Sequence, residues 1–309
     1  RGFNERKGVF FVEEIRMKRF ESCHPIFLMS YFVAVLILTM FNAHPVITGI
    51  SLIFALSFFF MLTGFNKGIK SVLWAIPLML VMALTNPVFV HKGETILFFL
   101  NDNPVTLEAV FYGINASLTI TAVYYWFQCY HAVMTSDKFV YLFGRVAPKL
   151  SLMLSLVLNF VPQFKKHYKE IDAAQKAMGV YSGNGYTERV RHKFRVISAL
   201  VSLSLENGVT TADSMKARGY GLPGRTAYAD FKWRRRDSAV SVVCLICCAA
   251  IIFGYASGGC AFVFYPTTSA ITFSVFDITT YGGAVFLSAV PTFMEIKENI
   301  LWHYLKSKI

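Results

Sequence analysis

Few residues of this sequence could perform chemistry, and most of them lack the spacing that an active site needs. The seven histidines are scattered along the chain without the spacing of metal ligands. The sequence has no GxxxxGK[ST] phosphate loop, no HExxH metal motif and no GxSxG nucleophile elbow. We therefore predict a protein that is not an enzyme, with no catalytic residue, no metal site and no cofactor.

Three cysteines, Cys244, Cys247 and Cys248, form a cluster that resembles a CxxC motif. Their neighbours are Val, Leu, Ile and Ala, and in such a stretch a free cysteine behaves as a small apolar residue. We predict that the three are buried rather than reactive. No disulfide framework is evident, and only Cys260 is expected near an outer face.

Two short elements of the form small–x–Gly stand out because each ends an amphipathic pattern: Ala177-Met178-Gly179 and Ala217-Arg218-Gly219. Alanine and glycine allow another backbone to approach closely, and a guanidinium can pair in bidentate fashion with a carboxylate or with carbonyls. Arg218 by itself is typical of a solvated surface charge. The repetition of the element suggests two docking points for partner proteins.

Helices must position these two elements. Gln163 to Met178 has the helical period, and Gly179 is a natural stop for it. Thr187 can cap a second helix, whose apolar positions recur every three or four residues: Val190, Phe194, Ile197, Val201 and Leu205. The apolar stretch from Pro148 to Phe164 is slightly short for a membrane span, and we predict a helix at the membrane interface.

The composition indicates a membrane protein. Of the 309 residues 55% are hydrophobic and 16% charged, and the mean hydropathy is +0.50, which is more apolar than a soluble domain allows. A formal charge of +12 could suggest nucleic acid as a partner. Nucleic-acid-binding domains do not carry repeated apolar stretches of membrane-spanning length, so we exclude that class.

Apolar stretches of about 18 to 20 residues make one crossing each as helices. We expect about six crossings. They are Pro25 to Phe41, Val46 to Phe65, Ser71 to Val90, Leu107 to Cys129, Ser238 to Gly258, and a weaker one that starts at or before Ile278 and ends near Ala289. The first twenty residues are largely polar and lack the core of a signal peptide, so we expect the first crossing to be retained.

Lys and Arg are retained on the cytoplasmic side, which orients the chain. Asp137 to Asp237 contains 18 Lys and Arg against 8 Asp and Glu, a net charge of +10, and is predicted to be cytoplasmic. Glu94, Asp102 and Glu108 mark an acidic outer loop. Basic residues also place both termini inside the cell: Arg1, Arg6, Lys7, Arg16, Lys18, Arg19, Lys297, Lys306 and Lys308.

The predicted fold class is all-α, a multi-pass protein of the cell membrane with a cytoplasmic insertion of amphipathic coupling helices. Residues 1–130 form an N-terminal membrane region of about four crossings. Residues 131–237 form the coupling region, which is too long for a connecting loop. Residues 238–309 form a C-terminal membrane region of about two crossings and a short cytoplasmic tail.

The segment around the second element carries a family resemblance. The stretch from Ala212 to Gly221, ADSMKARGYG, followed by Gly224-Arg225-Thr226, resembles the signature of the transmembrane T component of energy-coupling factor transporters. Shorter matches to the same family occur in order along nearly the whole chain: His24-Pro25, His44-Pro45, Thr135-Ser136-Asp137, Ala147-Pro148-Lys149, Phe160-Val161-Pro162 and Ala174-Gln175-Lys176-Ala177.

The resemblance implies a coupling subunit between two cytoplasmic ABC-type ATPases and a small membrane-embedded substrate-binding subunit, for the uptake of vitamins or of metal ions such as cobalt. It assigns ATPase docking to Ala177, Met178, Gly179, Ala217, Arg218 and Gly219. The family usually has Arg where this chain has Met178, so docking there is expected to be apolar. Apolar residues at helical spacing are predicted to contact the substrate-binding subunit: Leu154, Val157, Leu158, Val161 and Phe164.

The alternative class is a self-sufficient secondary transporter or channel. Such proteins usually place ionisable residues or broken helices near the middle of the membrane. The predicted crossings are nearly free of charge, and Asn86-Pro87 and Asn115 are their main polar interruptions. The sequence therefore favours the coupling subunit.

Overall fold

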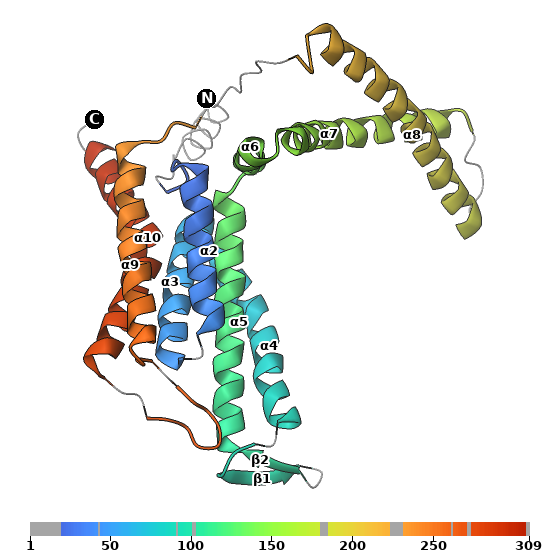
Figure 1. Cartoon of the computed structure of the whole chain (residues 1–309). Coiled ribbons are helices and arrows are strands. Elements are labelled where there is room, and N and C mark those ends of the chain that lie inside the picture. The colour runs from blue at the N-terminus through green and yellow to red at the C-terminus, as the bar shows by residue number, and fades with distance from the viewer. Residues whose placement is uncertain are drawn as a thin grey trace. The chain divides into compact units, whose positions relative to one another are not determined.

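The computed structural model describes residues 20–42, 44–90, 92–100, 103–179, 185–222, 231–260, 262–270 and 273–306. Over these residues the chain forms nine helices and one two-stranded sheet (Figure 1). It divides into two compact units. The first, here called the bundle, contains the residues up to Thr135 and from Phe231 onward, and the second, the insertion, is Ser136–Asp230.

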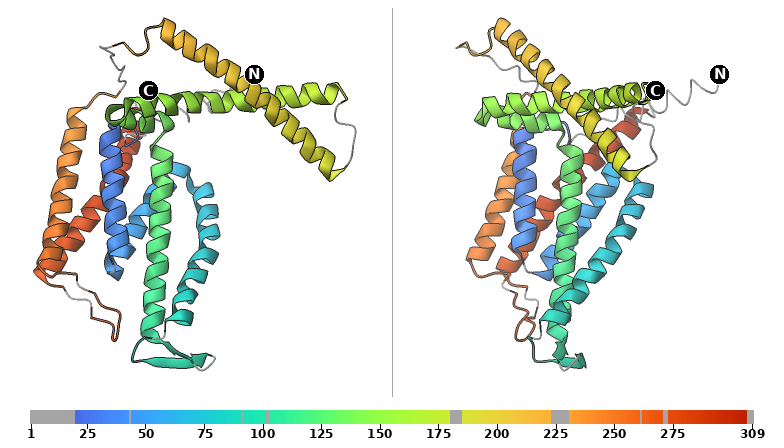
Figure 2. Two further views of the ribbon diagram at one scale, coloured as in Figure 1. Left: turned by 45° about the vertical axis from the view of Figure 1, so that its right-hand side comes forward. Right: turned by 90° about the vertical axis from the view of Figure 1, so that its right-hand side faces the viewer.

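Each of the six apolar stretches coincides with one helix of the bundle. These helices are α2 (Pro25–Phe41), α3 (Pro45–Thr63), α4 (Phe65–Phe89), α5 (Leu107–Val133), α9 (Arg235–Ala256) and α10 (Val275–Lys306). They run alongside one another, with α10 strongly tilted (Figure 2). Among the described residues, α3, α4 and α9 are long and apolar enough to cross a membrane, and α2 is apolar but has only 17 residues. The all-α prediction is confirmed except for one hairpin.

The hairpin joins α4 to α5, where the sequence indicated only an acidic loop. Strands β1 (Ile96–Leu100) and β2 (Asn103–Thr106) pair antiparallel. Glu108 is not a solvated charge, because its side chain is buried and accepts hydrogen bonds from the backbone and hydroxyl of Thr95. One of the three predicted outer charges therefore has a structural role.

The two ends of the bundle are each marked by a histidine that begins a helix. His24 caps α2 at the end here called proximal, and His44 caps α3 at the opposite, distal end. In both cases ring Nδ1 accepts a hydrogen bond from the backbone N–H two residues on, at 3.3 Å, and proline occupies the first turn. The His-Pro pairs are thus helix starts. The chain enters and leaves the insertion from the proximal ends of α5 and α9.

Aromatic rings fill the core of the bundle. Phe20 packs edge-on against Tyr31 and Phe58, with ring centroids 5.4 and 5.6 Å apart. A short polar chain links three helices beside these rings: Trp126 Nε1 donates to Ser51 Oγ at 2.9 Å, and Ser51 Oγ lies 2.7 Å from Thr39 Oγ1. These three polar groups thus have partners inside the core, as burial requires.

Glycines allow the closest helix contacts. A Cβ on Gly254 of α9 would overlap Thr280 Oγ1 of α10, and a Cβ on Gly283 of α10 would lie 2.8 Å from Ile251 Cγ1 of α9. Helices α4 and α5 approach in the same way at Gly113, whose Cβ would lie 2.5 Å from the Ala83 carbonyl oxygen. Small residues at these points let backbones pack at short range, as is common between membrane helices.

The insertion consists of α6 (Ser136–Val146), α7 (Pro148–Ala177) and α8 (Tyr186–Ala217), of which α7 and α8 cross (Figures 1 and 2). The sequence predicted two segments where α7 is one helix of 30 residues. Pro162 lies inside α7 and removes one backbone donor without ending the helix. The prediction that Thr187 caps α8 is wrong: Gly185 is the N-cap, and Thr187 lies in the first turn.

Some sequence predictions lie outside the described residues. These are the basic N-terminal flank up to Arg19, Asp102 of the acidic outer loop, the match at Gly224-Arg225-Thr226, the side chain of Lys306, and Lys308.

Candidate functional site

The two small–x–Gly elements lie at the C-terminal ends of α7 and α8 and have the same backbone geometry. Ala177 is the last residue of α7, Met178 is its C-cap, and Gly179 follows with a φ of +70°. The Gly179 N–H donates to the Lys176 carbonyl at 3.1 Å. Gly179 ends the helix as predicted, because its positive φ is a conformation that glycine adopts without strain.

The end of α8 repeats this arrangement. Arg218 is the C-cap, and Gly219 has a φ of +82° and donates to the Lys216 carbonyl at 2.9 Å. The Tyr220 N–H donates to the Met215 carbonyl at 3.0 Å, which completes a Schellman motif. The glycines fix the direction in which each chain leaves its helix, so Met178 and Arg218 occupy equivalent positions.

Both C-cap side chains are exposed. Met178 is 69% exposed, and Arg218, Ala177 and Ala217 are also on the surface. A Cβ on Gly179 would meet no atom within 4 Å, so this glycine is required for its backbone angle and not by crowding within the chain. The two elements offer a cation at one end and a flexible thioether at the other, and neither arrangement is catalytic.

Sequence reasoning missed the polar contact where α7 and α8 cross. Asp172 on α7 accepts a hydrogen bond from Lys176 Nζ at 2.7 Å, and its other oxygen lies 2.7 Å from His192 Nε2 on α8. Lys176 first and His192 second hold the pKa of Asp172 below its usual value. His192 is buried. It lies twenty residues from Asp172 in the sequence, so no local pattern predicts that the two side chains meet. This contact joins the two helices where they cross.

Apolar side chains line the exposed faces of both crossing helices. On α7 the exposed ones are Leu150, Met153, Val157, Leu158 and Val161. On α8 they are Phe194, Ile197, Val201, Leu205 and Val209, which recur every three or four residues and therefore form one stripe. Of the described residues in α7 and α8, only Gln175, His192 and Val196 are buried. Continuous apolar faces of this kind mark surfaces that another molecule covers.

The structure places the five predicted contact residues for a substrate-binding subunit on α7. Val157, Leu158 and Val161 are exposed, whereas Leu154 and Phe164 are half-buried. The Phe164 ring stacks on that of Phe160, with centroids 5.8 Å apart. Three of the five are thus exposed to a partner, and the other two are partly covered by the chain itself.

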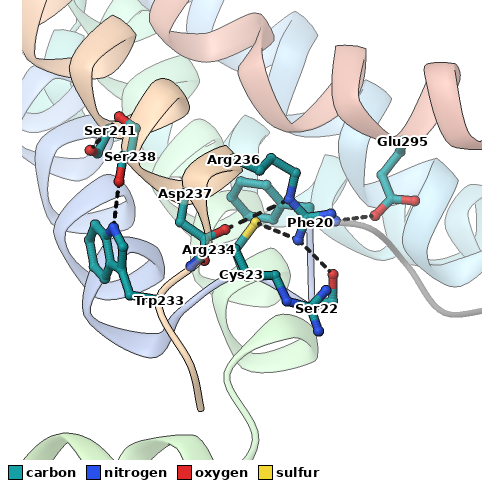
Figure 3. A network of polar contacts seen from close by, with 10 residues as sticks. All are labelled: Phe20, Ser22, Cys23, Trp233, Arg234, Arg236, Asp237, Ser238, Ser241 and Glu295. Atoms are coloured by element: carbon teal, nitrogen blue, oxygen red, sulfur yellow. Dashed lines mark hydrogen bonds and ion pairs between the residues drawn. The ribbon is translucent and has the colours of Figure 1, made fainter.

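A polar cluster at the proximal end of the bundle ties the segment before α2 to α9 and α10 (Figure 3). Arg236 Nη2 donates to Ser22 Oγ at 3.0 Å, and its Nε lies 3.7 Å from Asp237 Oδ1. The Phe20 N–H donates to Glu295 Oε1 at 3.3 Å. Buried carboxylates here anchor backbone and guanidinium groups, which is a structural role.

The cysteines of the bundle discussed next are not activated as nucleophiles. Burial raises the pKa of Cys23 to about 11, although Arg236 opposes the shift, so the protonated thiol predominates at neutral pH. Cys244 and Cys247 are free and buried in the bundle core, and Cys248 is free and half-buried. The prediction that this cluster behaves as small apolar residues is confirmed for the two buried members.

Comparison with known proteins gives a consistent result. The model of the family described as "Cobalt transport protein" (CbiQ) matches residues 19–228. Three similar proteins are each named energy-coupling factor transporter transmembrane protein EcfT. The Streptococcus thermophilus protein is 34% identical over 124 residues, 40% of this chain and 47% of that protein. The Listeria innocua protein is 27% identical over 224 residues, 66% of this chain and 80% of that protein. The Bacillus subtilis protein is 35% identical over 107 residues, 34% of this chain and 40% of that protein. The chain thus spans less than half the length of two of these relatives.

Proposed function

Because the chain belongs to the cobalt transport protein family, whose model covers residues 19–228, we propose that it is the transmembrane coupling subunit of an energy-coupling factor transporter. In this role it transmits motion from two ABC-type ATPases to a membrane-embedded substrate-binding subunit that takes up a vitamin or a metal ion. The chain itself is not catalytic, and ATP is hydrolysed on the partner subunits.

The observation that carries this proposal is the insertion, with two crossing helices that end in equivalent exposed caps and keep apolar faces exposed. We assign ATPase docking to the two caps with their flanking Ala177, Ala217, Gly179 and Gly219. We assign the substrate-binding subunit to the apolar face of α7 around Leu158. Two separate kinds of surface suit a subunit that must hold two kinds of partner at once.

The proposed topology has six crossings, α2 to α5 with α9 and α10. The proximal end of the bundle and both termini lie in the cytoplasm, with the insertion. The Lys and Arg excess of residues 137–237 supports this orientation. The three regions proposed for the chain, 1–130, 131–237 and 238–309, follow from the same assignment.

The placement of ionisable groups in the bundle disfavours a self-sufficient secondary transporter or channel. Among the described residues, the buried carboxylates Glu108, Asp237 and Asp277 lie in the first turns of α5, α9 and α10. Glu295 contacts Phe20 at the proximal end. Carboxylates at helix ends anchor backbone groups, whereas a transport pathway needs polar groups near the middle of the membrane.

The test compares the two caps. Arg218→Glu should abolish uptake and weaken ATPase binding sharply. Removing one member of a charge pair that is buried on docking leaves the other charge unpaired, which costs about 2 to 5 kcal/mol of binding free energy. Met178→Ala should cost about 1 to 3 kcal/mol through lost apolar burial. Raised salt should mimic the loss of Arg218 more than the loss of Met178. The measurements are ATPase co-purification and substrate uptake across a salt series, and equal, mild effects at both caps would refute asymmetric docking.

A further inference from the structure

The hairpin between α4 and α5 exposes an apolar strand at the distal end of the bundle. Ile96, Leu97, Phe98 and Phe99 of β1 are each between 52% and 67% exposed. Successive residues of a strand point to opposite faces, so both faces of β1 are apolar. A hairpin that stood free in water would leave all four side chains in contact with solvent, which is unfavourable for either face.

The base of the hairpin is fixed to the start of α5. Glu108 Oε1 accepts a hydrogen bond from the Thr95 N–H at 3.3 Å, and the Leu107 N–H donates to the Thr95 carbonyl at 3.0 Å. Thr106 Oγ1 donates to the Lys92 carbonyl at 3.0 Å. Gly93 packs so tightly here that a Cβ would lie 2.5 Å from Glu108 Oε2. These bonds on both sides of the base hold the strands crosswise to α4 and α5 (Figures 1 and 2).

The adjacent end of α4 presents the same kind of surface. Leu84, Val88 and Phe89 are exposed. Within the most apolar 18-residue stretch of α4, only 6% of the residues are buried in the protein. An apolar helix with so little protein around it is covered by lipid chains when it crosses a membrane. The apolar surface of the hairpin continues this lipid-facing surface toward the distal end of the bundle.

Backbone hydrogen bonding limits how deep the strand can lie. The described sheet has only two strands, so the outer edge of β1 has no strand beside it. Unpaired backbone N–H and carbonyl groups are costly in the hydrocarbon core, where water cannot reach them. The apolar side chains favour lipid and the free edge favours water, and both are satisfied where headgroups meet acyl chains.

We propose that the β1–β2 hairpin is an interfacial membrane anchor, with β1 immersed at the headgroup–acyl boundary of the leaflet at the distal end of the bundle. Its partner is the lipid surface itself. The anchor fixes the depth and rotation of α4 and α5 in the bilayer. This inference rests on the proposed membrane crossing of α4 and α5, and it requires no ATPase and no substrate-binding subunit.

The test measures the depth of the strand in the full chain, reconstituted alone into phosphatidylcholine vesicles. The six native cysteines are first replaced, and only a background that remains monodisperse is used. A nitroxide is then attached at Phe98→Cys or Phe99→Cys, on opposite faces of β1, and at Glu94→Cys as an exposed polar control at the base. Collision rates with oxygen, which partitions into lipid, and with a water-soluble nickel chelate are compared.

Labels at positions 98 and 99 should show an oxygen-to-nickel ratio several-fold above that of the label at position 94. A ratio at either strand position equal to that of the control would overturn the proposal, because that face would then be in water. Low collision rates with both reagents would also overturn it, because protein, a second copy of this chain included, would then cover the strand. The chain carries no partner subunit in this experiment, so failure of ATPase coupling would leave the result unchanged.

Discussion

In the bundle the large aromatic side chains are inside, where Phe20, Tyr31 and Trp126 are almost fully buried. In the insertion the large apolar side chains of the two crossing helices are outside, and α7 and α8 bury only three of their described residues. The buried group includes His192, which contacts the carboxylate of Asp172. A core of this size stabilises a helix pair weakly, and exposed apolar faces of this extent are typical of surfaces that another molecule covers.

The comparison predicts opposite outcomes for the same kind of substitution in the two units. Val35→Asp places a carboxylate in the bundle core, where Val35 is fully buried. It should destabilise the protein by about 3 to 5 kcal/mol, the cost of an uncompensated buried charge. Leu158→Asp alters an exposed position on α7, and a surface change should cost less than about 0.5 kcal/mol.

The folding and stability of both variants are measured by size-exclusion chromatography and thermal unfolding in mild detergent. Leu158→Asp should fold normally and keep the ATPases but release the substrate-binding subunit, whereas Val35→Asp should yield little monodisperse protein. If Leu158→Asp kept both partners, or aggregated as Val35→Asp does, the contrast between the units would fail.

A second prediction concerns the glycines that hold α9 against α10. Gly254→Val should destabilise the bundle by at least about 1 to 3 kcal/mol, because any Cβ there overlaps Thr280. Gly282→Ala is the matched control, since a Cβ on Gly282 would meet no atom within 4 Å. The thermal unfolding midpoint should fall for the first variant and stay unchanged for the second. Equal midpoints would mean that the two helices do not pack this closely.

The smallest expected effect is at the crossing of α7 and α8. Asp172→Asn should weaken the contact with Lys176 and His192 and broaden the distance between spin labels at Met153 on α7 and Leu205 on α8. Glu170→Gln is the control, because Glu170 is exposed and bonds only His167 and Lys166 of its own helix in the described part of the chain. An unchanged distribution for Asp172→Asn would show that the crossing is held by other contacts.

The same contact gives a pH dependence. The pKa of Asp172 is lowered in the folded protein, chiefly by Lys176 and then by His192. A lowered carboxyl pKa stabilises the fold above the unfolded-state value, near 3.8, and this contribution is lost as the pH falls through the folded-state value below it. Wild-type distances should therefore broaden only below about pH 4, whereas the Asn variant should be broad already at pH 7.

Local patterns were sufficient for most of the helices. The apolar stretch at Pro25 to Phe41 coincides with α2, and Gly179 ends α7 as its position in the sequence indicates. In these cases the signal is a run of apolar residues or a residue with special backbone freedom, and both act within a few neighbours. The sequence divided α7 into an apolar segment up to Phe164 and an amphipathic one from Gln163, whereas a single helix runs through both segments and through Pro162.

Contacts between distant residues could not be predicted in this way. The pairing of Asp172 with His192 and the hydrogen bonds of Glu108 with Thr95 depend on how the backbone folds back on itself. The hairpin was missed because β1 is apolar at every position, and a short apolar run does not distinguish a strand from part of a helix. The equivalence of Met178 and Arg218 was visible in the sequence as a repeat, but their common C-cap geometry required the structure.

The most direct test of the account is hydroxyl-radical footprinting of the chain alone and of its complex with two ATPases and the substrate-binding subunit. Met178 and Phe194 are 69% and 68% exposed in the chain by itself, and both side chains react readily when solvent reaches them. Oxidation of both should fall strongly in the complex, while the buried Trp126 should stay unreactive in either sample. Equal oxidation of Met178 and Phe194 in the two samples would contradict the claim that the insertion is the docking surface for the partners.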